Sequence, residues 1–450
     1  MTDADLVRRH AAPVPRYTSY PTAPHFGPEV DEATYRGWLA ALPDGTALSL
    51  YAHIPFCDRL CWFCGCTTKQ VLRYDPVAAY LPALHREIET VAALLDGRGR
   101  AAALHLGGGS PSLLRPGDLV GLARGVRRHF ALADRFEFSV EIDPSDMTED
   151  RHDGLAAAGV TRISIGVQDF DPRVQAAINR PQSFEQTRRV VEGVRSRGIG
   201  SVNLDVLYGL PHQTTAGVLA TVEQALALSP DRIALFGYAH VPWMKAHQRM
   251  IDETALPDAA ARYDQARAAA TRLVDAGYAA IGIDHFARAG DGLAVAAGSG
   301  ALHRNFQGYT TDAAPALIGF GASAIGSLPQ GHVQNAPATG EYRRRVAETG
   351  LAVARGVAFA GDDRLRGYVI ERLMCDFAIS VPVLRRLFGA AAEAIVVEMV
   401  GVAGEDADGL LAFDGDVFAV TETGRPFVRS IAARFDAYLA RNAARHSIAV

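Results

Sequence analysis

Hydrophobic positions alternate between two patterns from residue 48 to about residue 284. Short runs rich in apolar residues are each followed by longer stretches in which apolar residues recur at intervals of three and four. The runs SVNLDVLYG and RIALFGY are largely apolar, which is typical of parallel strands covered on both faces. The pattern predicts six βα units forming a partial (β/α)6 barrel. The expected strands are LSLYAHI, AALHLGG, FEFSVEI, RISIGVQ, SVNLDVLYG and RIALFGY.

The pattern changes at both ends of the chain. The segment VPRYTSYPTAPHF is punctuated by prolines and reads as an ordered arm or a flexible leader. After Ile325 three helical patterns surround LLAFDGDVFAVTETG, which carries an Asp-Gly hairpin signal. These helical patterns are DDRLRGYVIERLMCDFAIS, LRRLFGAAAEAIVVEMVGV and GRPFVRSIAARFDAYLAR. We therefore predict an α/β protein with an N-terminal arm (1–45), a barrel (46–350) and a small, mostly helical C-terminal domain (351–450).

Composition narrows the classes of partner. The chain has 450 residues, of which 49% are hydrophobic and 21% charged, as expected for a globular protein of two domains. A net charge of -5 provides no broad basic surface and argues against nucleic acid as a partner. We find no run of 18 apolar residues and no signal-peptide pattern, so we predict no membrane segment and a cytoplasmic location.

Four of the five cysteines lie between positions 57 and 66, in HIPFCDRLCWFCGC. Cysteine thiolates are the usual protein ligands of iron-sulfur clusters, and Cys57, Cys61 and Cys64 have a spacing that lets each bind one iron of a 4Fe-4S cubane. We predict that Cys66, one residue beyond Cys64, is not a ligand, which leaves one iron open. Cys375 lies in a helical pattern and is predicted to be a buried, inert thiol.

Two alternatives explain the same cysteines. A zinc site would use all four, although zinc sites usually pair two cysteine knuckles a dozen or more residues apart. An electron-transfer protein would also use four cysteine ligands and would bind no small molecule at the cluster. The number of thiolates that bind iron therefore separates an enzyme from an electron carrier.

Glycines and polar residues follow several predicted strands. In LHLGGGSPSLL, glycines would let backbone groups approach a ligand closely, and a plain tight turn is the alternative. Polar residues stand at four later strand ends, where a βα barrel places its binding residues. They are Glu141, Gln168, Asp205 and His240. Carboxylate and amide groups there suit the hydroxyl and ammonium groups of nucleoside-like ligands.

These motifs resemble those of known families. The CxxxCxxC spacing after the first strand, with Phe63 before the third cysteine, is similar to the radical S-adenosylmethionine (SAM) superfamily. Cys66 and residues 51–56, YAHIPF, resemble the oxygen-independent coproporphyrinogen III oxidase branch. RYTSYPT, YAHVPWMK and HRNFQGYTT also match that branch, so the resemblance covers nearly the whole chain.

The resemblance implies a radical SAM barrel and a set of site residues. The cluster ligands would be Cys57, Cys61 and Cys64. The catalytic residues would be Tyr51, Cys66 and Gln307. Contacts to a first SAM would come from Tyr51, Phe63, Gly108, Glu141 and Ile325. Contacts to a second SAM would come from Gly109, Ser110, Gln168, Arg180, Asp205 and Ala239.

The resemblance also implies a reaction. The family decarboxylates two propionates of coproporphyrinogen III oxidatively, without oxygen, to give protoporphyrinogen IX in haem biosynthesis, and it consumes two SAM molecules. It implies an electron donor such as a flavodoxin or ferredoxin, and a monomer. Arginines suit propionate recognition, and our candidates are Arg16, Lys245, Arg249 and Arg304. The alternative is a haem-binding or haem-delivery relative, which typically has phenylalanine in place of Cys66.

Overall fold

One 12-stranded sheet organises the molecule, and the computed structural model describes residues 3–439. Its order is β16-β15-β14-β13-β1-β4-β5-β6-β7-β8-β10-β9. The strands from β13 to β8 are parallel. They are β13 (Ala316–Phe320), β1 (Thr46–Ile54), β4 (Gly99–Gly108), β5 (Ala131–Ile142), β6 (Arg162–Gln168), β7 (Ser201–Tyr208) and β8 (Arg232–Gly237). The six predicted strands are all present, and the predicted α/β barrel class is confirmed.

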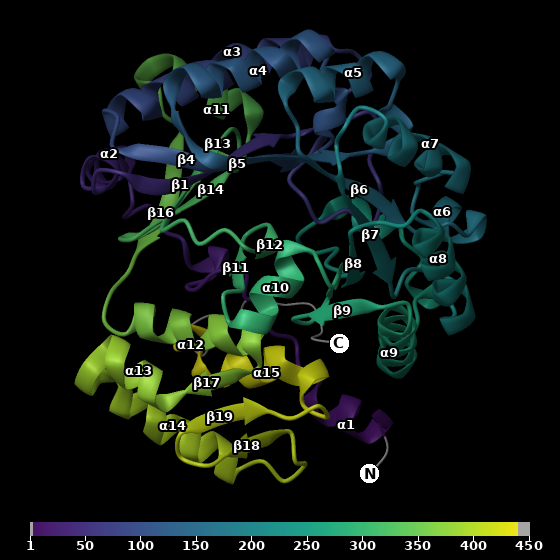
Figure 1. Ribbon diagram of the computed structural model, residues 1–450, viewed down its shortest axis with the longest axis vertical. Helices are drawn as coiled ribbons and strands as arrows, with labels where there is room; N and C mark the ends of the chain where they lie inside the picture. Colours follow the sequence, from purple (N-terminus) through teal and green to yellow (C-terminus); the bar gives the residue numbers. More distant parts are fainter. Residues whose placement is uncertain (1–2, 440–450) are drawn as a thin grey trace.

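Helices cover the outer side of the curved sheet (Figure 1). They are α3 (Asp75–Leu95), α4 (Pro116–His129), α5 (Glu149–Ala158), α6 (Pro172–Ala177), α7 (Phe184–Arg195), α8 (Thr215–Ala227) and α9 (Ala259–Asp275). Their apolar faces pack on outward-facing strand residues such as Ile163, Ile165 and Val202, which are fully buried. Removing these side chains from water is the main favourable contribution to the barrel's stability.

The inner face of the sheet corrects one expectation. Buried and half-buried residues alternate throughout β6 and along β7 as far as Val206, with Ser164, Asn203 and Asp205 on the half-buried side. The strands were expected to be covered on both faces. They are covered by helices on the outside only, because the inner face lines a polar cavity. The polar residues inside these strands are therefore positioned to bind a ligand.

Antiparallel strands flank the parallel ones at both edges, and the sheet remains open. The sequence patterns did not reveal these strands, which are short. They are β14 (Ile325–Leu328), β15 (Gly331–Asn335) and β16 (Val353–Ala358) at one edge, and β10 (His285–Arg288) and β9 (Tyr278–Ile281) at the other. The hairpin of β11 (His303–Asn305) and β12 (Gly308–Thr310) and the helix α10 (Gly292–Ser299) lie beside the second edge (Figure 1).

A smaller unit follows the sheet. It contains α12 (Asp363–Asp376), β17 (Ala378–Ser380), α13 (Val381–Phe388), α14 (Ala392–Gly404), the hairpin of β18 (Leu411–Phe413) and β19 (Val417–Val420), and α15 (Val428–Ala432). The predicted hairpin is present. The helix predicted over LRRLFGAAAEAIVVEMVGV is wrong as a single element, because Gly389 adopts a positive φ of 57° and divides it. The last predicted helix is reduced to α15 and short turns, and its final residues lie outside the described range.

The N-terminal arm is ordered and packs on this small unit. It contains α1 (Asp3–His10) and α2 (Glu32–Ala40). Leu6, Val7, Val14 and Tyr17 are buried in the same hydrophobic core as the C-terminal helices. The first and last parts of the described chain therefore fold against each other.

Among the described residues, one helical stretch, Val381–Gly404, has the length and hydropathy (1.7) of a membrane-crossing segment. Only 17% of that stretch is buried. The break at Gly389 divides it into α13 and α14, so it is not one continuous helix. By length and composition alone, the match is weak support for a membrane association.

A buried carboxylate ties α3 to the strands that carry the site. Glu87 accepts hydrogen bonds from Gly321 N (2.7 Å), Asn335 Nδ2 (2.6 Å) and Tyr342 OH (2.8 Å). Burial raises the pKa of Glu87 to about 7, although the three donors favour the ionised form. Because Gly321 follows β13, which pairs with β1, this carboxylate fixes the sheet next to the end of β1.

We predict that Glu87→Leu lowers the free energy of unfolding by about 3 kcal/mol or more, because it removes an acceptor shared by three buried donors. Anaerobic urea denaturation followed by circular dichroism measures the change. The control is Glu89→Leu, an exposed position on the same helix, for which we expect a change within about 0.5 kcal/mol. Equal stability of the two variants would contradict the assignment.

Candidate active site

The cysteine segment begins directly after β1 and folds back on itself. Cys57 lies in β2 (Phe56–Cys57), which pairs with β3 (Lys69–Gln70), and Val71 N donates to Cys57 O (2.8 Å). Cys61 is buried, Cys57 and Cys64 are half-buried, and Cys66 is exposed. The cysteine loop, residues 57–71, is therefore a closed loop at the carboxyl end of the first strand.

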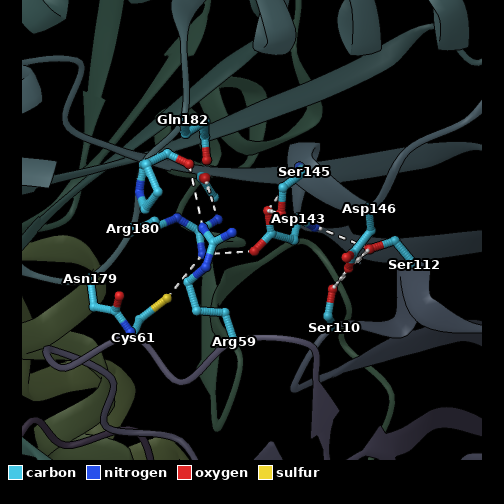
Figure 2. Close-up of polar contacts among 12 residues, drawn as sticks. Arg59, Cys61, Ser110, Ser112, Asp143, Ser145, Asp146, Asn179, Arg180 and Gln182 are labelled. Atoms are coloured by element: carbon cyan, nitrogen blue, oxygen red, sulfur yellow. Dashed lines mark hydrogen bonds and ion pairs between the residues drawn. The ribbon is translucent and has the colours of Figure 1, made fainter. Parts of the chain in front are cut away.

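The segment 178–181, after α6, holds one side of this loop (Figure 2). Trp62 N donates to Ile178 O (3.0 Å), and Asn179 Nδ2 donates to Leu60 O (3.0 Å). Arg180 Nη1 approaches Cys61 Sγ at 3.4 Å. These contacts hold the backbone of the cysteine loop in position, and they place the Arg180 guanidinium beside Cys61, one of the predicted cluster ligands.

Arg180 links the cysteine loop to the ends of two strands. Its Nη1 also pairs with Asp143 Oδ2 (2.9 Å), and its Nη2 donates to Gly166 O (2.7 Å). Burial raises the pKa of the Cys61 thiol, whereas the adjacent Arg180 charge lowers it. Burial alone would raise the pKa of Asp143, but Arg180 and Ser145 hold it below its usual value. The arginine thus favours negative charge on both neighbours.

The segment 239–248, after β8, holds the other side of the loop. His247 Nε2 lies 2.7 Å from Cys64 O, and Lys245 Nζ donates to Cys66 O (3.0 Å). Gln248 Nε2 donates to Phe63 O (2.9 Å) and to Ala239 O (3.1 Å). Residues from two distant parts of the barrel therefore fix the backbone around Cys61, Cys64 and Cys66.

The glycine segment packs directly against the start of the cysteine loop. Gly109 N donates to Ile54 O (2.9 Å), and Ser110 N donates to Phe56 O (2.7 Å). A Cβ on Gly109 would lie 2.6 Å from Phe56 O, so a side chain there would separate the two segments. The Ser110 hydroxyl donates to Asp146 Oδ2 (2.5 Å) and lies 2.9 Å from Ser112 Oγ (Figure 2). Close approach of backbones, and not a simple turn, explains the glycine at position 109.

Aromatic and acidic side chains line the sheet beside the loop. Tyr51 stacks on His105 with ring centroids 5.7 Å apart, and its hydroxyl lies 3.0 Å from His53 Nδ1. His105 Nε2 lies 3.1 Å from Glu141 Oε1, and Gly108 N donates to Glu141 Oε2 (3.0 Å). Burial would raise the pKa of Glu141, but these contacts hold it below its usual value. Glu141 is therefore a fixed anion at the mouth of the barrel.

A cavity of about 560 Å³ lies on the inner face of the sheet. Glu141, Asp205 and Gln307 line it, so three predicted site residues from distant strands and loops come together. Asp205 accepts hydrogen bonds from Ser164 Oγ (3.0 Å) and Asn203 Nδ2 (2.7 Å). Burial, followed by the charge of Glu141, raises the pKa of Asp205 to about 6. Two carboxyls in one cavity thus have different proton affinities.

Two of the four polar residues predicted at strand ends do not line this cavity. His240 is outside the cavity lining, in the loop after β8, where it bonds to Tyr238 OH (2.8 Å) and Glu253 (2.9 Å). Gln168 ends β6 in a left-handed backbone conformation with φ of 68°. This conformation is uncommon for residues other than glycine, and such strain clusters at functional sites.

The other predicted residues have these positions. Phe63 packs on the hydrophobic cluster that includes Leu207 and Tyr238, and Ile325 begins β14. Arg16 and Arg304 line a second cavity, whereas Lys245 and Arg249 lie near the cysteine loop, Arg249 being exposed. Cys375 is buried, as predicted, and burial raises its pKa to about 12, so it is an unreactive thiol.

The donor set fits a 4Fe-4S cluster. Within residues 3–439, no three His, Cys, Asp or Glu side chains converge on a point that could hold a single metal ion. A cubane takes each thiolate on a different iron, and Cys57, Cys61 and Cys64 on one fixed loop suit that arrangement. Arg180 beside Cys61 suits the anionic sulfur ligands.

The contacts that hold the cysteine loop gave no readable signal in the sequence, although Arg180 itself was predicted. Arg180 and Cys61 are 119 positions apart, as are Asn179 and Leu60, and no periodic pattern relates them. Asp143 stands two positions after Glu141 in SVEIDP, and its place at a strand end was the one signal that could have identified it. His247 and Gln248 act through backbone carbonyls, which carry no sequence information.

The fold and the site define a radical SAM enzyme, and residues 51–225 match the Radical SAM superfamily. The chain is 49% identical to the oxygen-independent coproporphyrinogen III oxidase of Bradyrhizobium diazoefficiens over 97% of both chains. It is 50% identical to that of Paracoccus denitrificans over 95% of this chain and 94% of the relative. The structure of coproporphyrinogen III oxidase from Escherichia coli, described as a radical SAM enzyme, matches with a TM-score of 0.91 at 37% identity, covering 98% of this chain and 99% of that one.

The chain belongs to the family of oxygen-independent coproporphyrinogen III oxidases, as its motifs predicted. The cofactors of this family are a 4Fe-4S cluster and SAM.

We predict that Cys57→Ala, Cys61→Ala and Cys64→Ala each lose the reconstituted cluster, because three thiolates are the minimum that holds a cubane here. Cys66→Ala should retain the iron and sulfide content of the wild type. Anaerobic iron and sulfide analysis with electron paramagnetic resonance measures both. Loss of the cluster in Cys66→Ala would show a fourth thiolate ligand and exclude an open iron.

Proposed function

We propose that this protein decarboxylates two propionates of coproporphyrinogen III oxidatively, under anaerobic conditions, to give protoporphyrinogen IX in haem biosynthesis, consuming two SAM molecules. The observation that carries this proposal is the full-length similarity to enzymes of that name, including the C-terminal unit and the arm. A generic radical SAM enzyme would share the barrel alone.

The chain's own residues have separable tasks. Cys57, Cys61 and Cys64 would hold the cluster. When bound, the cluster and SAM supply a one-electron cleavage that yields a radical able to take a hydrogen atom from carbon. The ordered loop contacts and the enclosed cavity position this chemistry and limit access of water.

Contacts to two SAM molecules are assigned as follows. For the first, we assign Tyr51, Phe63, Gly108, Glu141 and Ile325. For the second, we assign Gly109, Ser110, Gln168, Arg180, Asp205 and Ala239. The anionic Glu141 beside Gly108 and the shared cavity of Glu141 and Asp205 support this assignment, because carboxylates accept hydrogen bonds from ribose hydroxyls and ammonium groups.

Tyr51, Cys66 and Gln307 are proposed as catalytic residues. Tyr51 stacks beside the Glu141 network, and Gln307 lines the cavity that Glu141 and Asp205 also line. The exposed Cys66 lies next to Cys64, with its amide N 3.4 Å from Cys64 Sγ. All three are thus within the region where SAM and substrate would meet.

The cellular setting belongs to the same proposal. We propose a cytoplasmic monomer that receives electrons from a flavodoxin or ferredoxin and acts without nucleic acid or a membrane. The acidic net charge of -5 supports the exclusion of nucleic acid. A haem-binding or haem-delivery role is less well supported, because Cys66 is present and the relatives described above are named as oxidases.

The direct test is anaerobic incubation of the reconstituted protein with dithionite, SAM and coproporphyrinogen III. We expect 5'-deoxyadenosine together with a product carrying two vinyl groups, detected by mass spectrometry. SAM cleavage without loss of carbon dioxide, combined with tight stoichiometric haem binding, would instead assign the protein as a haem carrier.

The pKa of Asp205 generates a pH prediction. The carboxyl of Asp205 has a pKa of about 6 in the folded chain, compared with 3.8 for an ordinary aspartate. Its contribution to folding stability is therefore lost as the pH rises from 3.8 to about 6. SAM affinity should rise as the pH increases through 6, because an ionised carboxylate is the stronger acceptor.

The variant Asp205→Asn should remove this rise in SAM affinity, which anaerobic equilibrium dialysis measures. Asp153→Asn, an exposed position in α5, is the control. A rise that persists in Asp205→Asn would exclude this role.

A further inference from the structure

A second cavity, of about 330 Å³, lies where the barrel, the arm and the C-terminal unit meet. Tyr208 and Gly237 contribute the ends of β7 and β8, Arg16 comes from the arm, and Arg429 comes from α15. We name it the arginine cavity, because six arginines line it. They are Arg16, Arg262, Arg267, Arg304, Arg425 and Arg429. Two carboxylates, Asp284 and Glu422, also line it.

Backbone carbonyls orient several of these guanidinium groups. Arg16 Nη2 donates to Gly237 O (2.8 Å), Arg262 Nη2 donates to Tyr238 O (2.9 Å), and Arg429 Nη2 donates to Val14 O (2.7 Å). A carbonyl orients a cation without neutralising it. Of the two carboxylates, Glu422 pairs with Arg425 (2.9 Å) and Asp284 pairs with His285 (2.7 Å). Six arginines and two carboxylates thus line the cavity, and each carboxylate already has a basic partner.

Arg304 is the most informative residue of the arginine cavity. Its guanidinium lies over the Tyr309 ring, 4.4 Å from the centroid. Its Nε and Nη1 atoms are buried without a hydrogen-bond partner. Buried polar groups in native proteins are nearly always paired, so two unpaired nitrogens on one guanidinium point to a missing acceptor. Because Nε–H and Nη1–H point to different sides of the guanidinium, each could donate to a separate acceptor, such as an oxygen of a carboxylate.

Electrostatics agree with this geometry. Burial, followed by the charges of Arg16 and Arg304, lowers the pKa of Arg429 to about 9. Burial would raise the pKa of Asp284, but His285, Arg304 and Arg16 together lower it. The arginines thus repel one another and favour the ionised form of the one carboxylate between them. A bound anion would relieve this repulsion.

The arginine cavity shares a wall with the inner cavity of the barrel. Phe236, His285 and Tyr309 line the inner cavity, and their neighbours Gly237 and Asp284 line the arginine cavity. Arg304 and Tyr309, which stack on each other, lie on its two sides. A ligand held by the arginines would therefore be adjacent to the residues assigned to SAM and catalysis.

We propose that the arginine cavity binds carboxylates of the porphyrinogen substrate, namely the propionates that are not reacting, with Arg304 as the anchor and Arg16 as its partner. This proposal rests on the proposed function. It assigns a role to the arm and the C-terminal unit, which together complete the cavity. It also separates the four earlier candidates, because Lys245 contacts the cysteine loop and Arg249 is exposed.

The test compares Arg304→Gln, Arg304→Lys and Arg16→Gln with the wild type, using the reconstituted full-length protein. We expect the KM for coproporphyrinogen III to rise about tenfold or more in Arg304→Gln, because a charged hydrogen bond is lost. Arg304→Lys should be intermediate, because lysine retains the charge without the planar fork. Arg16→Gln, an accessible arm position, should also raise the KM. Arg189→Gln, exposed in α7, is the matched control and should not change it.

Two further measurements make the result decisive. Dithionite-driven SAM cleavage without substrate and the iron content should equal those of the wild type, which excludes a damaged cluster site. An unchanged KM in Arg304→Gln and Arg16→Gln would overturn the proposal. Stimulation by inorganic phosphate in the wild type but not in Arg304→Gln, with an unchanged KM, would assign the cavity to a free anion and also overturn it. Absence of product in the wild type would refute the proposed function, and this proposal with it.

Discussion

The placement of the cysteine loop is the constraint on which the rest of the structure depends. Three thiolates can share one cubane only if the backbone between them is held in place. The loop is short and has few apolar side chains of its own, so its neighbours hold it. The segments 178–181 and 239–248 bond to different parts of its backbone, and Gly109 and Ser110, after β4, bond to residues 54 and 56 just before it. Strands that are distant in the sequence supply all three supports.

The same barrel creates electrostatic differences between similar groups. Glu141 and Asp205 line one cavity, yet Glu141 is bonded to His105 and Gly108 N and remains an anion, whereas burial raises the pKa of Asp205. Separate environments for two carboxyls let one cavity hold ligands of different charge. The alternation along β6 and most of β7 makes this arrangement feasible, because these strands direct apolar residues outward and polar residues inward.

The arm and the C-terminal unit supply walls of the arginine cavity that the barrel alone does not provide. The sheet ends at antiparallel edges and does not close, and the arginine cavity lies beside the edge formed by β8 and β10. An acidic chain concentrates six arginines at this junction and orients several of them on backbone carbonyls. Burial, followed by the charges of Arg16 and Arg304, lowers the pKa of Arg429, so the binding of an anion at this junction would be favourable.

The sequence by itself determined the six parallel strands, the helices between them, the cluster cysteines and the family. These features are local: the hydrophobic period, the CxxxCxxC spacing and short motifs depend on neighbouring residues only. The sequence also indicated Glu141 and Asp205, because the ends of strands can be recognised from the hydrophobic pattern.

The sequence did not reveal the edge strands, the break at Gly389, the contact of Arg180 with Cys61, or the meeting of Arg16, Arg304 and Arg429. Those depend on how the sheet curves and how the two ends of the chain pack together, and contacts across such separations leave no periodic signal in one sequence. Tertiary structure alone decided them.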